Sequence, residues 1–253
     1  MESFTLTRIE MSGLLLSLTG VSPQKPLSIL QEAWTKFHHD EVRSGTTLPA
    51  FLSTDIPPIL HKIIKGGTVK GLSLGEIAAL GHLIEYSNLT VTAMQNWVKR
   101  DFKEYLGSPK AGKKYSFNQA ALLFMIDDLK SALDFESIRQ LFQLLFLMPE
   151  RDDDDLIEPA QMYSSYAGLF EEIKSNPVLH TQRIGGRDLH NNTWKDSSLA
   201  RATEGILTRL NHLSRNQREM VQHALLVAAI SVQTCYFQSL AKQYFNAVLF
   251  LDF

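Results

Sequence analysis

Residues 89–100 read LTVTAMQNWVKR, and this stretch decides to which fold class the chain is assigned. Thr90 is a good N-cap for a helix over residues 90–100. The apolar side chains that follow fall on one face of that helix, namely Val91, Met94, Trp97 and Val98. The other face carries hydrogen-bonding side chains, namely Thr92, Gln95, Asn96 and Lys99. Such a face is either ordinary protein surface or the face that a helix presents to a DNA groove.

A second short helix is predicted directly before this one, over residues 72–84 (LSLGEIAALGHLI). Ser73 followed by Glu76 is the pattern of a capping box, which marks a helix start. The connection EYSN supplies small polar residues between the two helices. Two short helices joined by a turn are typical of a helix-turn-helix, whose second helix enters the major groove.

Cations gather immediately after the second helix. Between residues 99 and 114 there are six cations and only two acids, although the whole chain has a net charge of −2. The Gly/Pro-rich segment 107–115 lies where a basic wing would follow a helix-turn-helix. Amide side chains pair with base edges and cations contact phosphates. The residues predicted to contact DNA are Thr90, Thr92, Gln95, Asn96, Lys99, Arg100, Lys110, Lys113 and Lys114.

At this point residues 70–148 resemble the MerR-type winged helix-turn-helix. The resemblance rests on LSLGEIAAL, LTVTAMQNWVKRDF, the wing-like GKKYS and the later DFESIRQLF. It implies that Thr90 caps the recognition helix and that Lys113, Lys114 and Tyr115 contact the DNA backbone. The arrangement also resembles an uncharacterised bacterial family with such a domain and a helical C-terminal part. The recognition helix departs from the MerR pattern, since Gln95, Asn96 and Trp97 stand where an arginine and aromatics are common.

Helical periodicity dominates the rest of the chain. Further helices are predicted over residues 27–39, between Pro57 and Gly66, and over about 116–133, 134–148, 160–174, 197–212 and 215–248. The acidic run PERDDDDLIEP divides the composition near residue 150. The predicted fold is therefore mainly α. A helical N-terminal region, residues 1–149, contains the winged helix-turn-helix with its small β wing, and residues 150–253 form an all-helical dimerisation or effector region.

Sequence patterns argue against several other classes of protein. There is no G-x-S-x-G, no P-loop and no strand followed by G-x-G-x-x-G, so we predict that the chain is not an enzyme and has no cofactor. The eight histidines show no i, i+3 or i, i+4 pairs, so no metal site is expected. The single Cys235 is interpreted as a small buried residue. The loop at 177–196, with Arg183 and Arg187, is either an anion pocket or a mobile segment.

Two observations concern where the protein acts. The apolar run Leu14–Leu18 lacks a basic segment before it, so a secretory signal is not expected. No stretch is judged to approach the roughly 20 apolar residues of a membrane span, and HALLVAAISV ends in polar residues. The sequence analysis therefore predicts a cytoplasmic protein without a membrane partner.

These observations favour a sequence-specific DNA-binding transcriptional regulator that binds double-stranded DNA as a homodimer. Two alternatives stay open. The first is a helical protein-interaction module that does not bind DNA. The second is a small-molecule sensor, with an effector pocket among the C-terminal helices.

Overall fold

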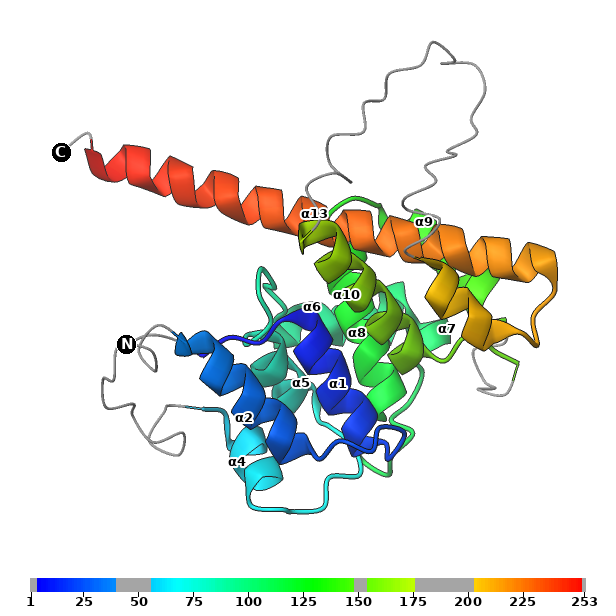
Figure 1. Ribbon diagram of the computed structural model, residues 1–253, viewed down its shortest axis with the longest axis horizontal. Helices are drawn as coiled ribbons and strands as arrows, with labels where there is room; N and C mark the ends of the chain where they lie inside the picture. The colour runs from blue at the N-terminus through cyan, green and yellow to red at the C-terminus, as the bar shows by residue number, and fades with distance from the viewer. Residues whose placement is uncertain (1–3, 40–55, 148–153, 176–202, 252–253) are drawn as a thin grey trace, which may run out of the picture.

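The computed structural model describes residues 4–39, 56–147, 154–175 and 203–251. Within these ranges the chain is mainly helical and contains no strand, only three isolated β-bridges (Figure 1). The mainly α prediction is therefore confirmed. The small β wing is not present as paired strands among these residues, since the segment expected to form it makes single bridges.

The helices follow one another along the chain with short connections. Their bounds are α1 Arg8–Leu18, α2 Pro26–Phe37, α4 Pro58–Ile64, α5 Leu74–Gly81, α6 Val91–Asn96, a π-helical turn Trp97–Asp101, α7 Lys103–Leu106, α8 Phe117–Leu129, α9 Phe135–Leu145, α10 Pro159–Ser175, a 3₁₀ turn Thr208–Leu210 and α13 Arg215–Leu251.

Capping boxes start three of these helices. In α5, the Ser73 hydroxyl accepts from Glu76 N and the Glu76 carboxylate accepts from Ser73 N. The same reciprocal bonds join Ser116 to Gln119 at the start of α8. Both boxes were predicted from the sequence. A third box, between Thr7 and Glu10, starts α1, which the sequence analysis did not predict as a helix.

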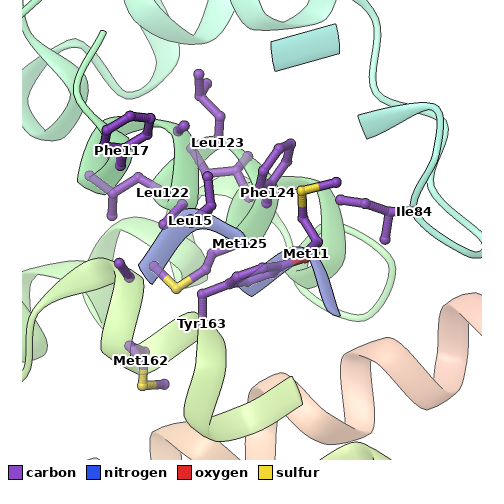
Figure 2. Packing of buried hydrophobic residues seen from close by; sticks show 14 of the residues in the cluster. Met11, Leu15, Ile84, Phe117, Leu122, Leu123, Phe124, Met125, Met162 and Tyr163 are labelled. Carbon is purple, nitrogen blue, oxygen red and sulfur yellow. The ribbon is translucent and has the colours of Figure 1, made fainter. Parts of the chain in front are cut away.

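Helix α8 lies at the centre of the core. Twelve of its thirteen residues are buried, because α1, α10 and α13 all pack against it. Figure 2 shows side chains from three helices gathered at this point: Met11 and Leu15 of α1, Phe124 and Met125 of α8, and Tyr163 of α10. One continuous cluster of buried side chains runs from Phe4 in the N-terminal segment to Val232 in α13. The chain on either side of residue 150 therefore shares one core.

Helix α13 crosses this core and then continues beyond it (Figure 1). Its first half packs on α8 and α10, whereas every described side chain from Ala241 to Phe250 is exposed. By length and composition, Arg215–Phe250 is the one helix in the described ranges that is apolar enough to cross a membrane, with a mean hydropathy of 1.5 in its most apolar window. This corrects the expectation that no stretch approaches a membrane span: the polar residues that follow HALLVAAISV are almost all uncharged and do not end the apolar character.

Candidate nucleic-acid interface

The predicted recognition helix forms as α6 and the π-helical turn that follows it. The Thr90 hydroxyl accepts a hydrogen bond from Ala93 N at 3.2 Å, so Thr90 caps the helix as predicted. The π-helical turn then admits one extra residue, and Phe102 N donates to Trp97 O at 2.9 Å. The helical segment therefore extends from Val91 to Asp101, and the fully buried Phe102 anchors its end.

The underside of this segment is packed into the core. Met94, Trp97 and Val98 are only 0%, 3% and 9% exposed, as the helical spacing predicted. Trp97 packs edge-on against Phe135. Val91, which was expected to join this face, is 36% exposed, because the first helical turn lies at the rim of the core. The buried underside fixes the orientation of the residues on the outer face.

The outer face of the segment is polar and open to solvent. All six of its predicted DNA contacts are exposed: Thr90, Thr92, Gln95, Asn96, Lys99 and Arg100. The Arg100 guanidinium forms an ion pair with Asp101 at 2.9 Å, which raises the pKa of Arg100 through a hydrogen bond to that carboxylate. Lys103, on α7, adds a further exposed cation. The face therefore combines amide and hydroxyl groups with positive charge.

Next to this helical segment lies a tight hairpin, residues 110–115, which we call the basic turn. Ala111 and Lys114 exchange backbone hydrogen bonds of 2.9 and 3.2 Å, and Gly112 at its tip has a φ of 69°. The basic turn is also held from outside, because Tyr115 and Leu72 exchange two backbone bonds of 2.8 Å. A Cβ on Gly71 would lie 2.6 Å from Ala111 Cβ, so the close approach requires glycine at this position.

Gln119 organises the loop that leads into the basic turn. Its amide donates to Ser108 O at 2.8 Å and to Leu106 O, and it accepts from Lys110 N at 3.0 Å. The side chain is 2% exposed, so these bonds are formed in the protein interior. The sequence indicated Gln119 only as a capping residue. Its role in holding the basic turn was missed, because the loop partners are unrelated to any helical spacing.

The predicted contacts in the basic turn differ in how far the protein already uses them. Lys110 and Lys113 are exposed, whereas Lys114 Nζ lies 2.7 Å from Glu76 Oε2 on α5. Burial alone would raise the pKa of Glu76, but hydrogen bonds from Lys114 and Ser73 outweigh it and hold this pKa below its ordinary value. Tyr115 is half-buried, and burial raises the pKa of its phenol. Lys114 thus ties the basic turn to α5.

A buried ion pair braces the connection between α5 and α6. Arg8 and Asp128, both almost fully buried, are joined by three hydrogen bonds of 2.7 to 3.1 Å, and Arg8 also donates to Glu85 O at 2.7 Å. Tyr166 completes the set by donating to Asp128 at 2.7 Å. Burial raises the pKa of the Asp128 carboxyl, and the Arg8 charge counteracts part of this rise. The helix pair is therefore attached to the core through α1 and α8.

A cavity of about 520 Å³ lies between this connection and α13. Its lining is mostly polar and comprises Tyr86, Asn88, Asp127, Lys130, Ser131, Phe135, Cys235, Gln238, Ser239 and Lys242. Asp127 is held by Ser87, which donates to it at 2.7 Å, and by Lys130, whose Nζ lies 2.6 Å away. Burial raises the pKa of the Cys235 thiol, so this cysteine is not an activated nucleophile.

Other candidate sites can be placed only in part. Within the described ranges, no three side chains of the types His, Cys, Asp and Glu come together to hold a metal ion. The loop at 177–196, including Arg183 and Arg187, lies outside the described residues.

Comparison with known proteins places the chain next to a family of undefined function. Residues 74–166 match the model of a domain of unknown function, DUF1836. The chain is also similar to the uncharacterized protein YkrK of Bacillus subtilis (strain 168), with 33% identity over 247 residues that cover 96% of this chain and 97% of YkrK. No solved structure matches the chain.

These findings correct the resemblance to the MerR type. No MerR or other helix-turn-helix family matches, and the matching domain runs from α5 to Tyr166 in α10, past the end of the supposed winged domain at residue 148. The resemblance was wrong because it rested on short capping, basic-turn and apolar-helix patterns. Such patterns arise wherever short amphipathic helices are joined by a basic loop.

Proposed function

The chain belongs to the same family as YkrK, and for this member we propose sequence-specific binding of double-stranded DNA as a cytoplasmic transcriptional regulator. In this proposal α5 and α6 act as a helix-turn-helix pair. The face of Val91–Asp101 lies in the major groove, and the basic turn contacts phosphates in the manner of a wing.

The observation that carries the proposal is the two-sided character of the Val91–Asp101 segment. Its apolar side is anchored by Trp97, 3% exposed, while Gln95 and Asn96 are exposed on the other side. Gln and Asn side chains form paired hydrogen bonds with the major-groove edge of adenine. A surface whose polar groups are held on a rigid support loses little conformational entropy when it binds.

The charge around this face supports the same proposal. Lys99, Lys103 and Lys113 are exposed, and no ion pair with an acidic side chain is observed for them within the described ranges. Cations that contact phosphates supply affinity that does not depend on base sequence. The basic turn is fixed to α5 by Lys114, so its remaining cations keep a defined position relative to α6.

The first experiment changes charge in the basic turn. We expect Lys113→Glu to weaken binding to every duplex and to reduce the slope of log affinity against log salt by about 1 to 2. Lys25→Glu is the matched control, because Lys25 is an exposed lysine at the start of α2, which packs on α1 and α4. Equal binding by the two variants in fluorescence anisotropy would argue against contact between the basic turn and DNA.

The second experiment separates base contacts from phosphate contacts. Gln95→Ala and Asn96→Ala should change which sequences are selected from a random duplex pool, at about 1 to 3 kcal/mol for each lost base pairing, and should leave the salt slope nearly unchanged. Thr68→Ala serves as a control, since Thr68 is exposed and lies outside α5 and α6. An unchanged selection profile in both amide variants contradicts base contact by this face.

A protein-interaction module is the competing interpretation of the same surface. It would use the exposed face for a protein partner and would elute early from a polyanion column at moderate salt. A regulator with cations directed at phosphates should elute late, in a salt-dependent manner. Early elution of the unmodified protein, together with no gel shift on genomic fragments, would favour the module.

The cavity beside the helix pair favours a second candidate function, that of a small-molecule sensor. Tyr86 in the α5–α6 connection contacts Tyr236 of α13, with ring centroids 5.2 Å apart, at the edge of this cavity. A ligand that fills the cavity would couple α13 to the proposed DNA-binding face. Thermal-shift screening of small carboxylates and phosphates tests this, with Ser239→Trp as a variant whose cavity is filled. A melting shift that survives this substitution would place the ligand elsewhere.

A further inference from the structure

Helix α13 has two apolar faces, of which only one is used by the described chain. Successive residues turn by about 100° in an α-helix, so Val221, Ala228 and Val232 lie on one side and Ile230, Phe237 and Tyr244 on the opposite side. The first three are at most 1% exposed, because they pack against the core. The second three are 52%, 55% and 68% exposed. We call this second side the outer face.

The outer face has the spacing of a coiled coil. Ile230, Phe237 and Tyr244 are seven residues apart, and Thr234, Ala241 and Val248 fall between them at alternating steps of four and three. Alternation of this kind keeps one continuous seam facing a partner helix over several turns. Phe245, 63% exposed, flanks the seam.

From this geometry we infer that the outer face of α13 pairs with the same face of a second copy of this chain. The inference goes beyond DNA binding and does not depend on it. A seam with this repeat is complementary to itself, because each side chain on one helix fits between four on the other. Lys242 is the one charged residue between positions 230 and 251, so pairing does not bring a series of like charges together.

The area of the outer face is sufficient for a dimer. Taking about 150–250 Å² for each aromatic side chain, the exposed parts of the apolar residues amount to roughly 600 Å² per copy. Two copies would then bury about 1,200 Å², which is the lower limit of stable interfaces. Figure 1 shows this half of α13 extending past the rest of the described chain, so a second helix can approach it along its length.

A lipid bilayer fits this surface less well. A membrane-spanning helix is apolar on all sides, whereas Gln238, Lys242 and Asn246 keep the other side of this half polar. Insertion of the whole helix would also remove Val221 and Ala228 from the core that they help to form. Membrane binding is therefore treated as an outcome that the experiment must exclude.

The test measures the oligomeric state of the full chain by sedimentation equilibrium at micromolar concentrations. The unmodified protein should have twice the chain mass of 28.6 kDa. The double variant Phe237→Glu with Tyr244→Glu should sediment as a monomer, because two charges per copy would be forced into the seam. The matched control, Gln243→Glu with Asn246→Glu, adds the same charge to the same exposed half but outside the seam, and it should remain dimeric.

Loss of folding is separated from loss of pairing by a second variant. Phe237→Leu with Tyr244→Leu keeps the seam apolar and should restore the dimer, with helical circular dichroism unchanged in every variant. A monomeric unmodified protein, a dimeric Phe237→Glu/Tyr244→Glu variant, or a monomeric control would each overturn the inference. Flotation of the unmodified protein as a monomer with phosphatidylcholine–phosphatidylglycerol vesicles would also overturn it and would identify the outer face as a lipid-binding surface.

Discussion

The polar face of α6 and the outer face of α13 are both exposed, yet the protein supports them in opposite ways. Beneath the α6 face lie Met94, Trp97 and Val98, all buried, so the face is held in place by the chain itself. The outer face of α13 consists of apolar side chains for which the described chain provides no cover beyond Val232. A polar surface on a rigid support suits a polar partner, whereas exposed apolar area gains stability only from a contact outside the chain.

The largest expected effect tests this comparison with the same kind of truncation on each side. Trp97→Ala should lower the free energy of unfolding by roughly 3–5 kcal/mol, because it removes a buried aromatic and leaves a cavity. Tyr244→Ala should change the stability of the monomer by no more than about 0.5 kcal/mol. Urea denaturation at low protein concentration measures both. Equal losses would show that the outer half of α13 packs within its own chain.

A loss of similar size is expected when the brace beneath the α5–α6 connection is broken. Arg8→Met leaves the Asp128 carboxylate buried without its cation and should cost roughly 3–5 kcal/mol of unfolding free energy. The double variant with Asp128→Leu removes both charges and should recover much of that loss. If the double variant is as unstable as Arg8→Met alone, packing of the Arg8 side chain matters more than its charge.

An intermediate effect is expected at the base of the basic turn. Gly71→Ala places a Cβ 2.6 Å from Ala111 Cβ and 2.7 Å from Tyr115 O, so it should cost roughly 1–3 kcal/mol through overpacking. Gly75→Ala is the control, because its nearest contact, Ser73 Oγ, is 4.0 Å away, and alanine favours the helix. Thermal melting compares the two variants. A neutral Gly71→Ala variant would mean that the basic turn is only loosely attached to the segment before α5.

The smallest expected effect is a pH dependence at the ion pair between Glu76 and Lys114. The folded-state pKa of Glu76 lies below its ordinary value of 4.5. The pair therefore stabilises the fold fully above pH 4.5 and loses this contribution as the pH falls through the lower, folded-state pKa. Because both side chains are partly exposed, the contribution is at most about 1 kcal/mol. Glu76→Gln should make stability between neutral pH and about pH 3 less pH-dependent, as followed by urea denaturation. An unchanged pH profile would indicate that the pair is broken in solution.

Local patterns in the sequence predicted the parts of the fold that depend on neighbouring residues. The capping boxes at Ser73 and Ser116, and the inward positions of Met94, Trp97 and Val98, follow from spacings of three and four residues. The box from Thr7 to Glu10 carries the same signal and would have predicted α1, had the apolar run after it been analysed as a helix.

Tertiary structure alone decided which residues meet across the chain. Arg8 and Asp128 are 120 positions apart, and Glu76 and Lys114 are 38 apart, so no local pattern could pair them. The same holds for α13: its sequence predicts one long helix with apolar residues on two sides, but only packing against α8 and α10 selects the side that is buried. Helix formation depends on local hydrogen bonds and side-chain spacing, whereas burial of a face depends on what other parts of the chain bring to it.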